Sequence, residues 1–463
     1  MKTIRIHIPL HTFCFIFLFI LTTCQPRNKQ PSGTTARDWP QIIKDGELKV
    51  LIDLSPTGYF IKQGQPTGFE FELISAFCKD HNLFLNTIII ENFDHIFHYL
   101  DSGLVDLAAA NLTITSQRKK KALFTTPVTI KQILLIKNKH TPDSSLKVYL
   151  RKNSSYSRNI QSINHSLPLT FEFVSGNIDD YDILDSVNTG NFQATLIDEN
   201  TFNIFKHKFP NIQIVTNLGI PQKIAWAVSI RSKKLHQKLN HWLKKFKKTR
   251  QYQRLIHKYF RHSQSSYVNQ FIALKKKRRI NITPFDETFK GAAKRTGVDW
   301  LLLAAIAYNE SRFNDSAVSH KNASGIMQLM PQTAAQFNID SSSSRYEHIL
   351  AGAKLYKIFY SRWLKITSDS SFAVKLALAS YNAGMGHILD AYRLAVHLNN
   401  NRPDWYDIQY YLLHKNRPEY YKSEWVKHGR CFCKEPVNFV HNVLNIYHLY
   451  KSIDNYMQNK QNV

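Results

Sequence analysis

The sequence of 463 residues is poor in cysteine and has no apolar run long enough to cross a membrane. Cys14 and Cys24 lie near the amino-terminus, which leaves Cys78, Cys431 and Cys433 of the five cysteines. This remainder is odd, and its last two members are too closely spaced for an easy disulfide, so a disulfide framework is not expected. Because no His or Cys partners stand at ligand spacing, we expect no metal and no other cofactor.

The first 24 residues have the features of a secretory signal. Lys2 and Arg5 precede the apolar run Phe13–Leu21, which is too short to span a bilayer. Cys24 and the polar stretch 25–44 resemble the lipidated cysteine and tether of a bacterial lipoprotein, although Thr23 replaces the usual small residue before the cysteine. We expect a protein at the periplasmic face of the outer membrane, lipid-anchored or peripheral. Cleavage without lipidation, which gives a soluble periplasmic protein, is the alternative.

Acidic residues are also scarce, since 34 Asp and Glu stand against 61 Lys and Arg. The excess is concentrated between Arg231 and Arg279, where 17 residues are Lys or Arg and none is acidic. Apolar residues at helical spacing predict one buried and one basic face: Leu235, Leu239, Trp242, Leu243 and Phe246. The basic face fits anionic lipid or wall polymers, and a merely solvated face is the alternative. Nucleic acid is not expected as a partner behind a secretion signal.

Residues 45–262 alternate strand-like and helix-like segments, which predicts an α/β domain with a mainly parallel sheet. The predicted strands are Leu48–Leu54, Phe84–Ile90, Val105–Ala110 and Gln132–Ile136, and the predicted helices are Glu70–His81 and Phe93–Leu100. A second lobe near 140–215 and a return strand over Ile224–Ile230 complete this domain. A basic linker, 263–283, follows it.

Two motifs of this region, PTGFEFELISAF at 66–77 and NLTITSQR at 111–118, resemble the amino-acid-binding family of bacterial solute-binding proteins. The resemblance implies a two-lobed fold, with Thr113 and Arg118 holding a ligand's α-carboxylate and Asp198 receiving its α-ammonium. A guanidinium pairs with a carboxylate through two hydrogen bonds, so the chemistry agrees. The alternatives are a solvated cation at a helix start for Arg118 and a turn cap for Asp198.

From residue 284 onward the pattern is helical, with clear segments over Glu347–Trp363, Phe372–Tyr381 and Asn438–Tyr450. An apolar run, Leu301–Tyr308, follows the helix cap Asp299, and Glu310 stands at its end. Burial disfavours the charged carboxylate and raises its pKa, which suits a general acid. A surface glutamate at a helix end is the alternative.

Three motifs resemble the transglycosylase domain of bacterial lytic murein transglycosylases, relatives of goose-type lysozyme: YNESRFN at 308–314, ASGIMQLMPQTAA at 323–335 and LASYNAGMGHILDA at 378–391. The resemblance implies a mainly α, lysozyme-like domain over 284–455, with Glu310 as catalytic acid and base. The implied substrate-groove residues are Ser311, Ser324, Gln328, Met330, Tyr381 and Asn382. For Met330, ordinary core packing is an equal alternative.

The resemblance further implies that one carboxyl group suffices, whereas ordinary glycosidases use two. The glutamate protonates the oxygen of the MurNAc-GlcNAc β-1,4 bond, and the sugar's own primary hydroxyl then closes an anhydro end. Asp315 replaces a usual proline and is a second acid or a turn residue. Phe439 replaces a usual tyrosine and lacks its hydroxyl, and Glu435 is a less certain groove residue.

The two resemblances predict a peptidoglycan-cleaving enzyme with a ligand-binding regulatory domain. Its partners would be glycan strands, a stem peptide or amino acid, and a membrane through the lipid anchor. One alternative is a hydrolase in which Glu310 activates water. Another is a catalytically silent wall-binding or amino-acid-sensing protein. A transporter's binding subunit would not need the last third of the chain.

Overall fold

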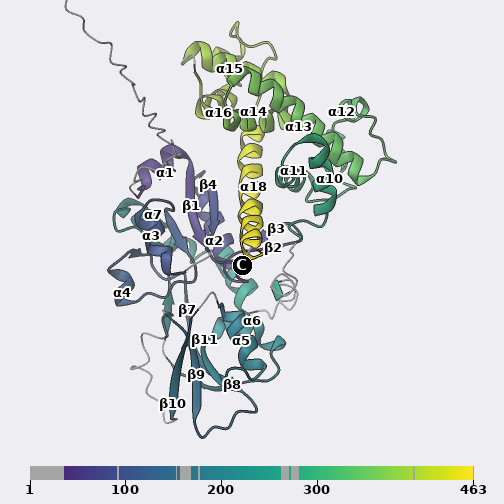
Figure 1. The fold of residues 1–463 in the computed structure, drawn as a ribbon. Coiled ribbons are helices and arrows are strands. Elements are labelled where there is room, and N and C mark those ends of the chain that lie inside the picture. The colour runs from purple at the N-terminus through teal and green to yellow at the C-terminus, as the bar shows by residue number, and fades with distance from the viewer. Residues whose placement is uncertain are drawn as a thin grey trace, which may run out of the picture. The chain divides into compact units, whose positions relative to one another are not determined.

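The computed structural model describes residues 36–461 except 91–92, 153, 157–167, 176–177, 220, 262–270, 273–280 and 400–401. The expected signal, Cys24 and most of the basic linker lie outside these residues. Among the residues described, no helix is both long and apolar enough to cross a membrane. A two-lobed α/β region, residues 36–261, precedes a mainly helical region, residues 281–461, as the sequence predicted (Figure 1).

The first lobe is a five-stranded sheet with the order β4-β1-β5-β14-β6. Its strands are β1 (Glu47–Ile52), β4 (Phe84–Ile89), β5 (Leu107–Ala109), β6 (Leu123–Phe124) and β14 (Ala227–Val228). Its helices are α1 (Trp39–Asp45), α2 (Phe69–Asp80), η1 (Phe93–His95), α3 (Ile96–Asp101), α4 (Ser116–Lys119), α7 (Lys233–Phe246), α8 (Arg250–Ile256) and η4 (His257–Arg261). The apolar face predicted for α7 is buried throughout.

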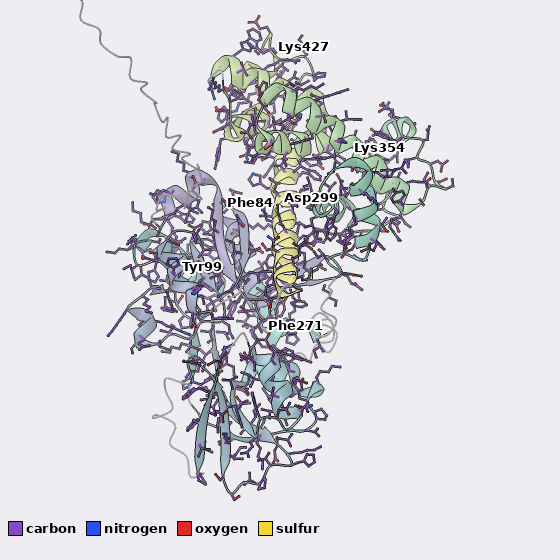
Figure 2. All side chains as sticks on the ribbon, in the orientation of Figure 1. Phe84, Tyr99, Phe271, Asp299, Lys354 and Lys427 are labelled. Carbon is purple, nitrogen blue, oxygen red and sulfur yellow. A yellow bond between two sulfur atoms is a disulfide. The ribbon has the colours of Figure 1, made fainter. Side chains whose placement is uncertain are left out.

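The second lobe is a five-stranded sheet with the order β10-β9-β11-β8-β12. Its strands are β8 (Ile133–Asn138), β9 (Leu146–Arg151), β10 (Leu169–Val174), β11 (Ala194–Asp198) and β12 (Ile212–Asn217). Its helical segments are α5 (Asp180–Asn188), α6 (Glu199–Phe205) and η3 (Lys206–Lys208). Phe271, within the expected linker, packs into this lobe with its ring 5.8 Å from that of Phe205 (Figure 2).

The expectation of mainly parallel sheets is wrong, because each sheet has two parallel and two antiparallel pairs. The chain crosses between the lobes twice, through the antiparallel pair β7 (Thr129–Lys131) and β13 (Gln222–Ile224). A strand that returns after such a crossing, such as β14, therefore enters the sheet against the direction of β5. The parallel pairs join β1 to β4 and β5 in the first lobe, and β9 to β10 and β11 in the second.

The helical region is built around α11 (Trp300–Ser311), whose residues from Leu301 to Tyr308 are all buried. The carboxylate of Asp299 accepts a hydrogen bond from the Leu301 N–H at 2.9 Å, which confirms the predicted helix cap. The other helices are α10 (Asp286–Thr296), α12 (Pro331–Gln336), α13 (Arg345–Thr367), α14 (Ser370–Ala383), α15 (Met385–Leu398), α16 (Trp405–His414), α17 (Pro418–Tyr421) and α18 (Lys434–Gln461).

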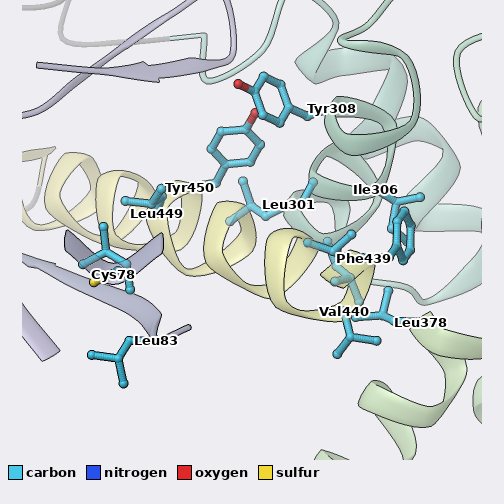
Figure 3. Packing of buried hydrophobic residues seen from close by; sticks show 14 of the residues in the cluster. Cys78, Leu83, Leu301, Ile306, Tyr308, Leu378, Phe439, Val440, Leu449 and Tyr450 are labelled. Atoms are coloured by element: carbon cyan, nitrogen blue, oxygen red, sulfur yellow. The ribbon is translucent and has the colours of Figure 1, made fainter. Parts of the chain in front are cut away.

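The long helix α18 belongs to the packing of both regions. It packs on α11 and α14, and further along it packs on β4 of the first lobe (Figures 1 and 3). The Asn445 side chain accepts a hydrogen bond from the Leu85 N–H at 3.0 Å, and Ser452 donates one to the Thr87 carbonyl at 2.9 Å. The sequence predicted the middle of this helix but not its contact with the sheet.

A second contact joins α18 to the hairpin of β2 (Phe60–Lys62) and β3 (Gln65–Thr67). The hydroxyl of Tyr450 donates to the Gly64 carbonyl at the hairpin tip, at 2.5 Å. Gly64 has a φ of +80°, and a Cβ there would clash with the ring of Phe313. Tyr450 also lies beside Tyr308 of α11, with ring centres 6.5 Å apart (Figure 3). The hairpin therefore contacts both α18 and the segment that follows α11.

A fully buried ion pair, Lys415 with Asp390 at 2.6 Å, fixes the segment before α18. Asp390 also accepts hydrogen bonds from the N–H groups of Lys427 and His428, at 3.0 and 2.9 Å (Lys427 is labelled in Figure 2). Burial alone would raise the pKa of Asp390, but Lys415 and these two N–H groups lower it overall.

We expect Lys415→Met to lower the free energy of unfolding by up to about 3–5 kcal/mol, because it removes the buried cation of Asp390 and leaves that carboxylate paired with the half-buried Arg393, at 3.2 Å. Urea unfolding followed by tryptophan fluorescence measures the loss. Lys422→Met, at an exposed lysine nearby in the chain, is the control and should change little. A loss below about 1 kcal/mol for Lys415→Met, within the range of an exposed pair, would contradict this role.

Candidate active site and ligand pocket

Glu310 stands in the last turn of α11, where it is half-buried. Burial first, and the nearby Glu435 second, raise the pKa of Glu310 to about 8. Glu435 lies in the first turn of α18, so the second carboxyl group comes from a distant part of the chain. A carboxyl group with this pKa is mostly protonated at neutral pH, which is the state that a proton donor requires.

Tyr381, on α14, forms a wall next to Glu310. Its hydroxyl donates to the Met327 carbonyl at 2.9 Å, and burial together with the neighbouring Glu310 holds the pKa of Tyr381 well above its usual range. The ring of Phe439 stacks parallel to that of Tyr381, with 6.4 Å between centres. Phe439 therefore contributes a ring that packs against Tyr381. The hydroxyl group near Glu310 is that of Tyr381.

Ser311 and Gln328 shape the loop that follows α11. The Ser311 hydroxyl donates to the carbonyl of Ile326 at 2.9 Å. Both N–H bonds of the Gln328 amide are directed at backbone carbonyls, those of Ala317 and Gly325, each at 2.9 Å. The Ser311 hydroxyl and the Gln328 amide N–H groups therefore donate to carbonyls within the protein. Of the Gln328 amide, the oxygen remains to accept a hydrogen bond from a ligand.

Two other predicted groove residues, Ser324 and Met330, belong to the same loop, and a third, Asn382, stands on α14. Ser324 exchanges backbone hydrogen bonds with Leu329, at 3.0 and 3.1 Å, which draws the loop into a tight bend. Met330 is 44% exposed, so the core-packing alternative for it is wrong, and its neighbour Met327 is the buried methionine. Asn382 is half-buried at the end of α14.

Asp315 does not take part in this group. Its carboxylate pairs with the guanidinium of Arg345 at 2.5 Å in an exposed position. Asp315 is therefore neither a second acid beside Glu310 nor a turn cap. Its ion pair connects the loop to the first residue of α13. The second carboxyl group beside Glu310 is Glu435, which the sequence had marked only as an uncertain groove residue. No local pattern around Glu435 signals this proximity.

Thr113, Arg118 and Asp198, which are expected to hold a ligand, all line one pocket between the two lobes. Arg118 lies in α4 and donates to the Thr113 carbonyl at 3.0 Å. It is half-buried, unlike the exposed lysines that follow it, which disfavours a merely solvated cation. Asp198 precedes α6 without capping it through its side chain, so the turn-cap alternative is wrong.

Asp198 already has partners that the sequence did not reveal. It accepts a hydrogen bond from the hydroxyl of Tyr156 at 2.6 Å and pairs with the buried ammonium of Lys131 at 3.3 Å. Asp53 also lines the pocket, and one of its buried oxygens has no hydrogen-bond partner among the described residues. Burial raises the pKa of Asp53, although Ser55 and Lys131 oppose this. The pocket therefore holds acidic and basic groups close together.

Cys431 and Cys433 form a disulfide, with 5.3 Å between Cα atoms, so the expectation that they would not pair is wrong. The segment bends enough between them to reach the usual Cα separation of a disulfide. His387 lies near both sulfurs, a proximity that sequence spacing did not reveal. However, the disulfide consumes the two thiolates, and Lys415 donates to Nδ1 of His387 at 3.1 Å. This cluster therefore does not form a ligand set for a metal in the present state.

Comparison with known proteins matches two family models in order along the chain. Residues 48–262 match the bacterial extracellular solute-binding proteins, family 3, and residues 287–402 match the transglycosylase SLT domain. A membrane-bound lytic murein transglycosylase F of Pseudomonas putida (strain W619) is 30% identical over 419 residues, which cover 88% of this chain and 85% of the relative. The protein of the same name from Saccharophagus degradans is 26% identical, with 88% and 82% covered.

Among solved structures, an ancestral arginine-binding protein bound to arginine matches 46% of this chain and 98% of its own. The two are 21% identical, and the TM-score is 0.41.

The geometry predicts that Glu435→Gln lowers the pKa of Glu310, because the variant removes the like charge that disfavours ionisation. Titration of 13C-labelled glutamate carboxyl signals, with Glu310 assigned through Glu310→Gln, measures the shift. Glu424→Gln, at an exposed site, is the control for net charge. An unchanged Glu310 pKa in Glu435→Gln would show that the two carboxyl groups do not interact.

Proposed function

The chain belongs to the family of membrane-bound lytic murein transglycosylase F, and we propose that Glu310 is the acid and then the base of its reaction. The enzyme is a lytic murein transglycosylase with a solute-binding-like amino-terminal region. The observation that supports the role of Glu310 is its raised pKa at the end of a buried helix. At neutral pH such a carboxyl group carries the proton that the leaving oxygen needs.

In the proposed reaction Glu310 first donates a proton and then accepts one. Protonated Glu310 gives its proton to the glycosidic oxygen between MurNAc and GlcNAc as the bond from that oxygen to the anomeric carbon breaks. The resulting carboxylate takes the proton of the MurNAc primary hydroxyl, whose oxygen then bonds to the anomeric carbon. The product is an anhydro-MurNAc end, no water is consumed, and Glu310 is protonated again.

Several neighbours would position the sugar rather than exchange protons. The loop shaped by Ser311 and Gln328 supplies backbone at Ser324 and the exposed side chain of Met330. Asn382 and the ring of Tyr381 border the same place from α14. We propose these residues as the lining of the substrate groove.

Glu435 supports a second candidate reaction. A hydrolase needs two carboxyl groups, and Glu435 is close enough to Glu310 to raise its pKa. In that case Glu435 would activate a water, and the product would carry a reducing end. The two reactions differ by one water in the mass of the product.

Digestion of purified peptidoglycan followed by mass spectrometry of the muropeptides tests the proposal. We expect anhydro ends from the wild type and from Glu435→Gln, and none from Glu310→Gln. Products one water heavier, lost in Glu435→Gln, would establish the hydrolase. Cleavage that survives in Glu310→Gln would remove this residue from its role. No cleavage by any form would support a silent wall-binding protein.

We further propose that the pocket between the lobes binds a stem peptide or amino acid and thereby regulates cleavage. A ligand carboxylate would lie at Arg118 and Thr113, and its ammonium at Asp198, where it would compete with Lys131. The pocket loop that contains Asp53 leads directly into β2, whose hairpin contacts Phe313, three residues after Glu310. This hairpin gives a physical connection between the two sites.

Arg118→Gln should weaken binding of purified stem peptides by about 10- to 100-fold, since a charge-assisted hydrogen bond contributes about 1.5–3 kcal/mol. Calorimetric titration measures the change, and Lys120→Gln, at an exposed lysine of the same segment, should retain wild-type affinity. Equal affinities in the two variants would remove Arg118 from the ligand site.

The envelope location of the family also supports a lipid on Cys24, followed by a tether. We propose attachment at the periplasmic face of the outer membrane.

A further inference from the structure

The solvent face of α7 and its flanks is strongly basic. Eight cationic residues are exposed on this stretch: Arg231, Lys233, Lys234, Lys238, Lys244, Lys245, Lys248 and Arg250. We call them the α7 basic face. Among the described residues, the ion pair formed by this set is that of Arg231 with Asp101, at 3.6 Å between exposed groups. Most of its positive charge is therefore uncompensated.

Two acidic residues hydrogen-bond α7, and neither does so through the cationic side chains of the basic face. Asp38 caps the helix by accepting hydrogen bonds from the Lys234 and Leu235 N–H groups, at 3.1 and 2.7 Å. Asp80 accepts from the indole N–H of Trp242 at 2.8 Å. Both carboxylates thus serve the buried side and the start of the helix.

A second basic cluster adjoins the first. Residues 119–121 are three exposed lysines, one residue separates them from β6, and β6 packs against α7. His236 of α7 hydrogen-bonds the Phe124 carbonyl of β6 at 2.8 Å, and Asn240 accepts from the Thr126 N–H. Exposed positive charge therefore also lies at α4 and the residues that follow it, in the same lobe.

The apolar side of α7 is fully engaged in the core of the lobe. Leu235, Leu239 and Leu243 are buried, and Trp242 stacks on Phe246 at 4.3 Å between ring centres. The helix cannot insert this side into a bilayer without unfolding the lobe. Attraction to a partner must therefore be electrostatic, and salt will screen it.

The described chain begins beside this face. The Ser232 hydroxyl, next to the start of α7, donates to the Arg37 carbonyl at 2.7 Å, and α1 packs on α7. Only residues 25–35 separate Cys24 from Ala36. Even fully extended, such a segment reaches about 40 Å. An anchor at Cys24 would hold the basic face near the membrane surface.

We propose that the α7 basic face docks on the anionic headgroups of a lipid bilayer. Clusters of four to eight Lys or Arg residues near a membrane anchor are attracted to anionic lipid in this way. Six of the eight cations are lysines, which act as mobile point charges and do not require the fixed geometry of one bound anion. The attachment is independent of the catalytic role of Glu310 and operates with or without a lipid on Cys24.

Sedimentation with vesicles tests the proposal on a protein that begins at Gln25 and so lacks the lipidation site. Vesicles of phosphatidylcholine alone are compared with vesicles that also contain phosphatidylglycerol. We expect binding to the anionic vesicles only, weakening as salt rises. The test variant changes five lysines of the α7 basic face to glutamine: Lys233, Lys234, Lys238, Lys244 and Lys245.

The matched control changes five exposed lysines of the helical region to glutamine: Lys354, Lys357, Lys365, Lys422 and Lys427. Both variants lose the same charge. The α7 variant should lose at least about 10-fold in vesicle affinity, since each surface cation contributes about one kcal/mol, whereas the control should stay within about 2-fold. Both variants should keep wild-type cleavage of solubilised glycan, which verifies folding.

Three results would overturn the proposal. Equal losses in both variants would mean that net charge alone acts. Undiminished vesicle binding by the α7 variant would place the membrane contact elsewhere. Binding of the wild type to purified sacculi but not to anionic vesicles, with loss in the α7 variant, would make a wall polymer the partner of this face.

Discussion

The half-buried carboxyl group of Glu310, with Glu435 near it, is the central electrostatic feature of the catalytic region of this enzyme. A helix that is apolar all round, α11, carries Glu310 into a poorly solvated position, and the start of α18 places a like charge next to it. Both effects disfavour ionisation, so they act in the same direction on the pKa. The buried pair of Lys415 and Asp390 matters because it fixes the segment from which α18 starts.

Helix α18 connects the catalytic region to the first lobe. The start of α18 holds Glu435 and Phe439 at the site, and its later turns pack on β4. Tyr450 contacts both Tyr308 of α11 and the tip of the β2–β3 hairpin. A movement of the first lobe on ligand binding would therefore be felt at α11. Such coupling requires two states that the ligand distinguishes. The chain passes between the lobes at the paired strands β7 and β13.

Sequence patterns predicted those structural features that depend on residues close together in the chain. Period and capping predicted α11 and the buried face of α7. Arg118 and Asp198 were named through a family resemblance, and the structure places both in the lining of one pocket. Contacts between distant segments were not predictable, because nothing in a helical repeat says which surface will cover it. The contact of α18 with β4, the charge of Glu435 beside Glu310 and the pairing of Lys131 with Asp198 are of this kind. Spacing along the sequence does not predict the Cys431–Cys433 disulfide, because the pairing depends on the bend of the chain between the two residues.

The dependence of kcat/KM on pH measures the protonation of Glu310 during catalysis, because this quantity reports ionisations of the free enzyme. Glu310 must be protonated to act as the acid, so the rate should fall as pH rises through the Glu310 pKa of about 8. We predict a single descending limb near that pH on soluble glycan chains at constant ionic strength. A descending limb near the ordinary glutamate pKa of about 4.3, or a rate that rises through pH 8, would show that a protonated Glu310 with a raised pKa is not the acid.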